Sequence, residues 1–204
     1  MMTEHTLMQQ LKTATEAEHR LTEVASLAAK IRDGSLQIDE YQDLIVKNFL
    51  IHHQLEQSLQ LVLEQVQEQR LTQFFRERSH SLAQDLAALG LSDRVTPADI
   101  PAFPIQPTVA HLLGTLYVLE GSMLGNQYIA KALRQNDHLK AISAFHFYQK
   151  DAETGNRWRE FQALTNQSNI MDSNEVITAA CSAFQYFRMV FETKLNAVPP
   201  RPAH

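Results

Sequence analysis

Hydrophobic residues recur along most of the chain at spacings of three and four, the period of a helix that is buried on one side. The clearest run covers residues 41–62, where the apolar side consists of Tyr41, Leu44, Ile45, Phe49, Ile51, Leu55, Leu59 and Val62. A similar run near the C-terminus consists of Val176, Ile177, Ala180, Phe184, Phe187 and Phe191. A strand would require strict alternation, and no segment shows it convincingly. The pattern therefore predicts helices.

Further helices are expected at residues 5–28, 71–89 and 108–134 and around Trp158. Asp172 followed by Glu175 predicts a capping box at the start of the last helix. Residues 96–107 must be a connection, because prolines at 97, 101, 104 and 107 forbid a continuous helix. We expect an all-α fold, a multi-helical bundle forming a single domain over residues 1–204, with a flexible tail at 197–204.

Composition and charge narrow the class of protein. The chain has 204 residues, of which 44% are hydrophobic, enough for one substantial core. Its formal charge of -5 gives no basic field for nucleic acid. Cys181 is the single cysteine, which excludes an intramolecular disulfide and a cysteine-built zinc site. The N-terminal residues are acidic where a signal peptide is basic, and no apolar run approaches the roughly 18 residues of a membrane span. We expect a cytoplasmic protein without a membrane partner.

The segment VLEGSMLGNQYIA, residues 118–130, places two glycines inside a predicted helix. Each glycine costs about 1 kcal/mol relative to alanine at such a position. Gly121 and Gly125 are one turn apart and so lie on the same face. This bare face suits either a closely packed helix or a flat ligand that touches the backbone.

Among the nine histidines, His19 has the most suggestive neighbours. Helical spacing places it on one side of the first helix with Met8, Leu11, Lys12 and Thr15, which suits a partly buried site. A neutral imidazole there could bind iron, with Glu23 one turn later orienting the ring. The alternative is a core histidine satisfied by a neighbour. His52 and His53 are adjacent and point about 100° apart, which makes them a poor joint metal site.

Three segments together resemble the haem oxygenase family, in its bacterial, biliverdin-producing branch. LKTATEAEHRLTE, residues 11–23, is similar to the segment that carries the haem-ligating histidine. YVLEGSMLGNQYIAKAL, residues 117–133, is similar to the distal helix, and GNRWREF, residues 155–161, to a segment before the last helix. The segments occur in the family's order and at suitable separations, so the resemblance spans roughly residues 7–195.

The resemblance implies an oxidoreductase that cleaves haem to biliverdin, carbon monoxide and ferrous iron, using O₂ and electrons from an external reductase or ferredoxin. Haem would be both substrate and cofactor, held between two helices. The implied iron ligand is His19, and the implied catalytic residues on the distal side are Gly121, Ser122 and Gly125. The implied haem-binding residues are Lys12, Arg157, Arg159 and Phe184. For the arginines, an exposed surface charge is the competing interpretation, and for Phe184 it is plain core packing.

The sequence also departs from the family pattern. Ser122 stands where the animal enzymes have a distal aspartate, and Asn126 where a second glycine is common. A serine can form hydrogen bonds but cannot hold the charge of a carboxylate, and Glu120, the nearest acid, is interpreted as a solvated or capping residue. A haem carrier or sensor without ring-opening activity is therefore the alternative. A helical interaction module, which would bind no haem, is a further alternative. Other enzymes of this fold need a nucleophilic cysteine or clustered metal ligands, and Cys181 has no histidine or basic residue near it in sequence to activate its thiol.

Overall fold

The computed structural model describes residues 6–149, 151–167 and 172–195, and all regular secondary structure within these ranges is helical. The all-α prediction is thus confirmed, while the tail predicted at 197–204 lies outside the described residues. The helices are α1 (Leu7–Ala25), α2 (Ala28–Asp33), α3 (Ile38–Val66), α4 (Gln69–Thr72), α5 (Ser79–Ala88), α6 (Val109–Gln135), α7 (Thr154–Gln167) and α8 (Ser173–Glu192), with 3₁₀ turns η1 (Ser92–Arg94), η2 (Pro97–Asp99) and η3 (Asp137–Leu139) in the connections.

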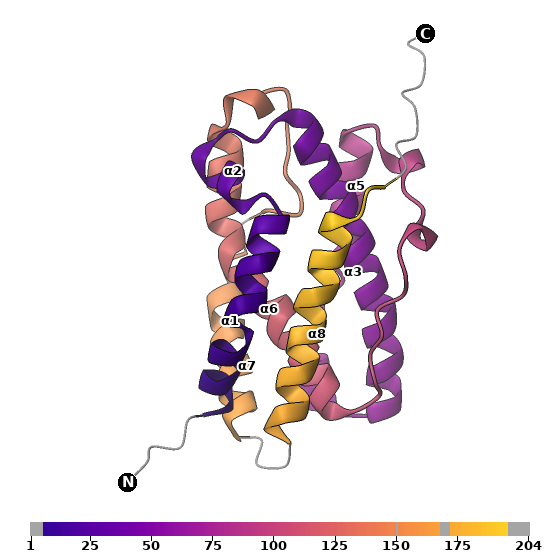
Figure 1. Ribbon diagram of the computed structural model, residues 1–204, viewed down its shortest axis with the longest axis vertical. Coiled ribbons are helices and arrows are strands. Elements are labelled where there is room, and N and C mark those ends of the chain that lie inside the picture. Colours follow the sequence, from indigo (N-terminus) through magenta and orange to yellow (C-terminus); the bar gives the residue numbers. More distant parts are fainter. Residues whose placement is uncertain (1–5, 150, 168–171, 196–204) are drawn as a thin grey trace.

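The long helices lie roughly along one axis (Figure 1). α1 and α8 lie side by side at the front of this view and run in the same direction, with α6 behind them. The two front helices are joined by an ion pair between Arg188 and Glu18, whose Nη1 and Oε2 atoms are 2.9 Å apart. The Thr22 hydroxyl also donates to the Phe184 carbonyl at 3.2 Å. α8 packs against both α1 and α6, and so it holds the first and the glycine-containing helices in one frame.

The helix predicted at residues 5–28 ends earlier than expected. α1 stops at Ala25, and Leu27 has a φ of 59°, in the left-handed region that a leucine rarely adopts. The chain then turns into the short helix α2, which ends at Gly34 with a φ of 74°. Because no glycine or proline marks the break at residues 26–27, the periodic pattern alone could not reveal it.

The single helix predicted at residues 71–89 is wrong. α4 and α5 are separate, and Glu56 of α3 supplies the reason. Its carboxylate accepts hydrogen bonds from the backbone N–H groups of Arg78 and Ser79, the latter at 3.0 Å, and from the Ser79 hydroxyl. These bonds satisfy amide groups that would otherwise be unpaired where α5 begins. The partner lies more than twenty residues away, so local sequence could not indicate the break.

The predicted capping box at the last helix is half correct. The Asp172 side chain does cap α8, but it accepts from Asn174 N at 2.8 Å. Glu175 does not complete the box. Its Oε1 instead accepts from the Thr108 hydroxyl at 2.9 Å and lies 3.2 Å from His111 Nδ1. The carboxylate therefore ties the start of α8 to the start of α6.

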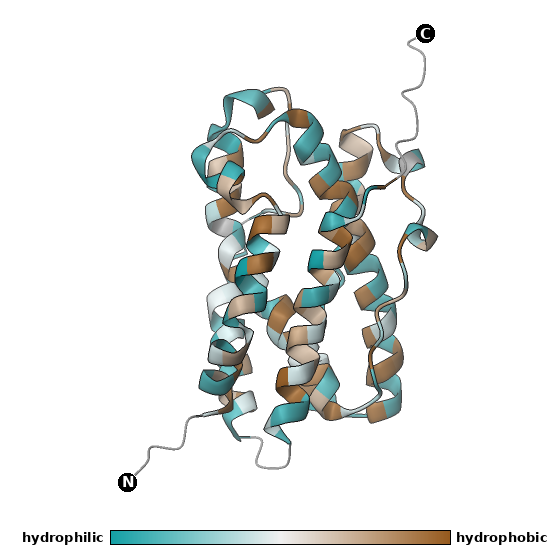
Figure 2. Cartoon of the chain, viewed as in Figure 1, coloured by the Kyte–Doolittle hydropathy of each residue, from teal (hydrophilic) through white to brown (hydrophobic). Residues whose placement is uncertain are grey.

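Close contact between α6 and α8 depends on Gly114. A Cβ atom at this position would lie 2.4 Å from the Val176 carbonyl oxygen and 2.8 Å from both Ala179 Cβ and Ala180 N. Only glycine permits the two backbones to approach this closely. Figure 2 shows hydrophobic and hydrophilic bands alternating along α8, as expected for a helix with one buried side.

One buried polar residue stands out in the core. His52 on α3 is 3% exposed, and its ring lies edge-on to Phe147 at 5.1 Å and to Phe187 at 5.9 Å. Burial, assisted by the charge of Arg78, lowers the pKa of His52 from its usual 6.5 to about 3. The imidazole is therefore neutral at physiological pH.

We predict that Gly114→Ala destabilises the fold by about 1–3 kcal/mol, because the new methyl group overlaps the α8 backbone. Gly125→Ala is the matched control, since a Cβ there meets no atom within 4 Å. That control should be neutral or stabilising by up to about 1 kcal/mol, the gain in helix propensity. Urea unfolding of both variants measures the difference, and equal stability of the two would contradict the account.

We also predict a pH dependence from His52. Between pH 6.5 and 3 the unfolded chain binds a proton at this residue that the folded chain does not, so the free energy of unfolding falls as the pH is lowered. From pH 7.5 to 5 the contribution is about 2 kcal/mol, set by the unfolded pKa. His52→Gln should lack this contribution, measured as the wild-type-minus-variant difference in unfolding free energy at the two pH values. A difference independent of pH would refute the assignment.

Candidate functional site

A cavity of about 560 Å³ lies between α1, α6, α7 and α8. Its volume is within the range of small-molecule sites, roughly 300–1,000 Å³. Residues predicted from sequence account for much of its wall. Those that line it are Lys12 and His19 from α1, Gly121, Ser122 and Gly125 from α6, and Phe184 from α8. The fold thus brings together segments separated by some hundred residues or more.

α1 presents its polar residues to the cavity at helical spacing. Lys12, His19 and Glu23 all line it, seven and then four residues apart. The His19 ring meets Phe184 of α8 edge-on, with centroids 5.5 Å apart and an interplanar angle of 86°. His19 is otherwise exposed, so it is not a core histidine satisfied by a neighbour. Its imidazole is free to bind a ligand in the cavity.

Across the cavity, α6 presents a bare backbone. A Cβ atom on Gly125 would meet no atom within 4 Å, and one on Gly121 would meet only the Trp158 ring, at 3.6 Å. Neither glycine makes the close helix contact seen at Gly114. Their free face borders open space. A flat ligand could occupy this space, whereas a closely packed helix would have left neighbouring atoms there.

Ser122 lies between the two glycines and has its hydroxyl hydrogen engaged. Its Oγ donates to the Leu119 carbonyl at 2.7 Å. The oxygen lone pairs remain available, so in this rotamer Ser122 acts as an acceptor toward the cavity.

A second cavity of about 420 Å³ adjoins the first, and Ser122, Gly125 and Phe187 line both. Its further polar residues include His52 and Asn48 from α3, Arg32 from α2, and Asn126, Tyr128 and Tyr148. No local sequence pattern predicts that α3 lines this space, because His52 and its neighbour His53 point in different directions on the helix. Burial raises the pKa of Tyr148, so its hydroxyl is un-ionised at neutral pH.

The two predicted arginines do not line the main cavity. Arg157 is on α7, where its Nη2 lies 3.1 Å from Glu120 Oε1 and its Nη1 donates to the Gln73 carbonyl at 3.0 Å. Arg159 is exposed and donates to the Asn156 side chain. Gln162 and Tyr117, which the sequence pattern did not single out, also line the cavity. Tyr117 is hydrogen-bonded to Thr15, and burial raises the pKa of its phenol.

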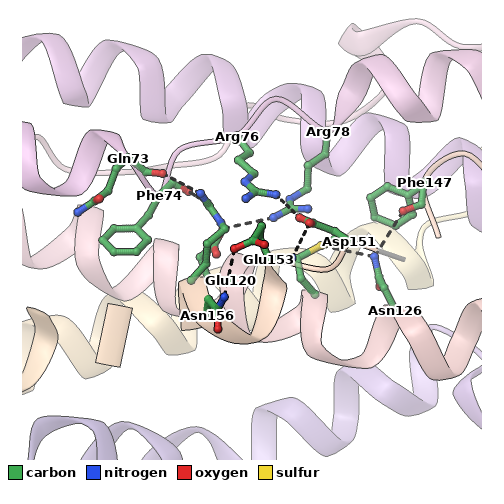
Figure 3. A network of polar contacts seen from close by, with 12 residues as sticks. Gln73, Phe74, Arg76, Arg78, Glu120, Asn126, Phe147, Asp151, Glu153 and Asn156 are labelled. Carbon is green, nitrogen blue, oxygen red and sulfur yellow. Dashed lines mark hydrogen bonds and ion pairs between the residues drawn. The ribbon is translucent and has the colours of Figure 1, made fainter. Parts of the chain in front are cut away.

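Glu120 also differs from its predicted role. It is neither solvated nor a cap, because it is 3% exposed and its carboxylate is bound by Arg78 and Arg157 (Figure 3). Within the described ranges, no three His, Cys, Asp or Glu side chains are grouped so as to hold a metal ion. None of the described helices is both long and apolar enough to cross a bilayer.

Several known proteins resemble this chain in sequence or in fold. Residues 5–193 match the family model described as "Heme oxygenase". A haem oxygenase of Xanthomonas campestris is 33% identical over 115 residues, which are 55% of this chain and 66% of that relative. The solved haem oxygenase of Neisseria meningitidis superposes with a TM-score of 0.67 at 22% identity, covering 97% of this chain and 98% of that one.

A further solved structure is that of a haem oxygenase from the cyanobacterium Synechocystis in complex with haem. It superposes with a TM-score of 0.61 at 18% identity, and the match covers 92% of this chain and 91% of that one. At such identities the solved structures establish the shared all-α fold. The family match extends over most of the sequence, and the chain therefore belongs to the haem oxygenase family.

Proposed function

We propose that this protein binds haem in the main cavity and cleaves it oxidatively to biliverdin, carbon monoxide and ferrous iron. The observation that carries the proposal is the pairing of one free histidine with a bare glycine face across a single cavity. When bound, haem would supply both the iron that activates O₂ and the ring that is oxidised. The chain's own residues bind, orient and shield it.

On the α1 side, His19 is the proposed iron ligand. Its neutral imidazole offers a ring nitrogen to the metal, and the edge-on contact with Phe184 restricts the ring's orientation. Glu23, one turn later, is the α1 carboxylate that lines the same cavity, and we assign it the role of assisting that orientation. Because the described residues hold no cluster of metal ligands, a group that brings its own equatorial ligands fits this site better than a bare ion.

Lys12 is the proposed partner of the haem propionates. It is the one Lys or Arg among the described residues that line the main cavity, and Gln162 and Tyr117 add hydrogen-bonding groups to the same cavity wall. Arg157 is committed to Glu120 and Arg159 lies outside the cavity. We therefore assign charge recognition to Lys12 and leave the arginines out of the haem site.

On the α6 side, Gly121 and Gly125 leave room for O₂ next to the backbone. Ser122 can accept a hydrogen bond, and the adjoining cavity is lined by the polar side chains of His52 and Asn126 as well as by Ser122. We propose that water held among these groups delivers protons, with Glu23, which lines both cavities, as the carboxylate at their border. Phe184 and Phe187 add apolar wall to the main cavity.

A haem carrier or sensor with the same fold is the second candidate. The hydrogen bond from Ser122 to Leu119 favours it, because that hydroxyl does not donate into the cavity. Turnover separates the two functions. The enzyme also needs electrons from an external reductase or ferredoxin, whereas a carrier does not.

We predict that the purified protein binds haemin in a one-to-one ratio with a sharp Soret band, and that reductant and O₂ convert this complex to biliverdin. His19→Ala should alter the Soret band and abolish conversion, because the iron loses its ligand. Absorbance titration followed by product chromatography measures both. Binding without ring opening would support the carrier, and absence of saturable binding would overturn both haem-based functions.

We further predict that Gly125→Leu raises the haemin dissociation constant at least about tenfold, because the new side chain fills space that the porphyrin needs. Its stability should not fall, since nothing packs against this position. Gly155→Leu is the matched control, an exposed helical glycine that is likewise free of neighbours within 4 Å and lies away from the main cavity. Equal haemin affinities of the two variants would refute the assignment of the glycine face.

A further inference from the structure

The buried carboxylate of Glu120 lies immediately before the glycine stretch of α6. Its Oε1 atom is 3.3 Å from Arg78 Nη2 and 3.1 Å from Arg157 Nη2. Figure 3 shows Glu120 in a polar network that also contains Arg76, Arg78 and Asp151. Arg78 precedes α5 and Arg157 belongs to α7, so one carboxylate joins three elements.

The surrounding charges are balanced, and Glu120 and its two arginine partners are largely removed from water. Three arginines face three carboxylates, and the members are Arg76, Arg78, Arg157, Glu56, Glu120 and Asp151. Burial lowers the pKa of Arg78 to about 10, which leaves it charged at neutral pH. When one partner of such a buried pair is lost, the other charge stays uncompensated. Glu120 is therefore required by two cations at once.

A second contact lies beside this ion pair. Trp158 follows Arg157 on α7, and its ring carbons are 3.6 and 3.7 Å from the position of a Cβ on Gly121. Consecutive residues of α7 thus meet consecutive residues of α6, Arg157 with Glu120 and Trp158 with Gly121. Trp158 also lines the main cavity, where it stacks on Phe161 at 5.7 Å.

The glycine stretch of α6, residues 121–125, depends on these contacts with α7 because the face that it turns to the cavity is open. Gly125 has no neighbour that would touch a side chain, and Gly121 has only Trp158. Glycine also gives the backbone more freedom than any other residue. Because the cavity face is open and the glycines are flexible, this part of α6 is held in place mainly by the ion pairs of Glu120 on its opposite side.

We propose that Glu120 is a positioning residue whose double ion pair with Arg78 and Arg157 fixes the glycine stretch of α6 and the Trp158 ring relative to the cavity. Its role in haem binding rests on the proposed function above. The position of the Trp158 ring does not depend on that proposed function, because it is a property of the protein without ligand.

Glu120→Gln and Glu56→Gln make a matched pair of variants. Both keep a side chain of the same shape and remove one buried carboxylate from the same cluster. Glu56 binds the backbone of residues 78 and 79 and the Ser79 hydroxyl, and it makes no ion pair with α7. Any difference between the two variants therefore reports the ion pairs of Glu120 with Arg78 and Arg157.

Trp158 is the single tryptophan of the chain, so its fluorescence reports its seating without haem. We expect Glu120→Gln to increase the acrylamide quenching constant of the ligand-free protein about twofold and to raise the haemin dissociation constant about tenfold, with Glu56→Gln close to wild type in both. Equal effects of the two variants at matched folded fraction, or none from Glu120→Gln, would overturn the proposal.

Glu120→Asp covers the case in which Glu120→Gln does not fold. It keeps the charge and draws the carboxylate back by one methylene, and it should shift Trp158 quenching in the same direction by a smaller factor. Unchanged quenching in Glu120→Asp would count against the proposal. If the wild type itself binds no haemin, the proposed function fails, while the quenching comparison still decides the role of Glu120.

Discussion

The structure depends on how closely α6 can approach α8. At Gly114 the two backbones touch at a distance that no side chain would permit, and this contact fixes one end of α6. α1 packs along the same helix α8, so α8 sets the separation between the histidine and the glycine face. Three glycines in one helix therefore do two different things: Gly114 closes an interface, and Gly121 and Gly125 keep a wall bare.

Charge is divided between the two faces of α6. On the cavity side the wall formed by α6 is backbone, with Ser122 as its polar side chain between the glycines, and Lys12 and Glu23 contribute charged side chains from α1. On the opposite side, buried arginines and carboxylates gather around Glu120. These buried charges hold the helix, while α6 itself presents no charged side chain to the main cavity. The neutral state of His52, enforced by burial, fits the same pattern.

Local pattern was sufficient for much of the fold and for part of the site. Periodicity located the helices, and it placed Lys12 and His19 on one face of α1, which the structure brings to the cavity. Local pattern could not predict contacts between residues that are distant in sequence. The carboxylate of Glu56 separates α4 from α5, Glu120 takes Arg157 away from the cavity, and the packing of α3 brings His52 next to Ser122. In each case the deciding partner is far away in sequence, so no local signal exists.

The proposed haem site lies between His19 and the glycine face of α6. Anomalous scattering at the iron edge, from crystals of the protein with haemin, locates the metal without assuming a role for any residue. We expect a single iron peak within bonding distance of a His19 ring nitrogen, on the cavity side of α1. An iron peak bound by another residue, or lying outside this cavity, would contradict it.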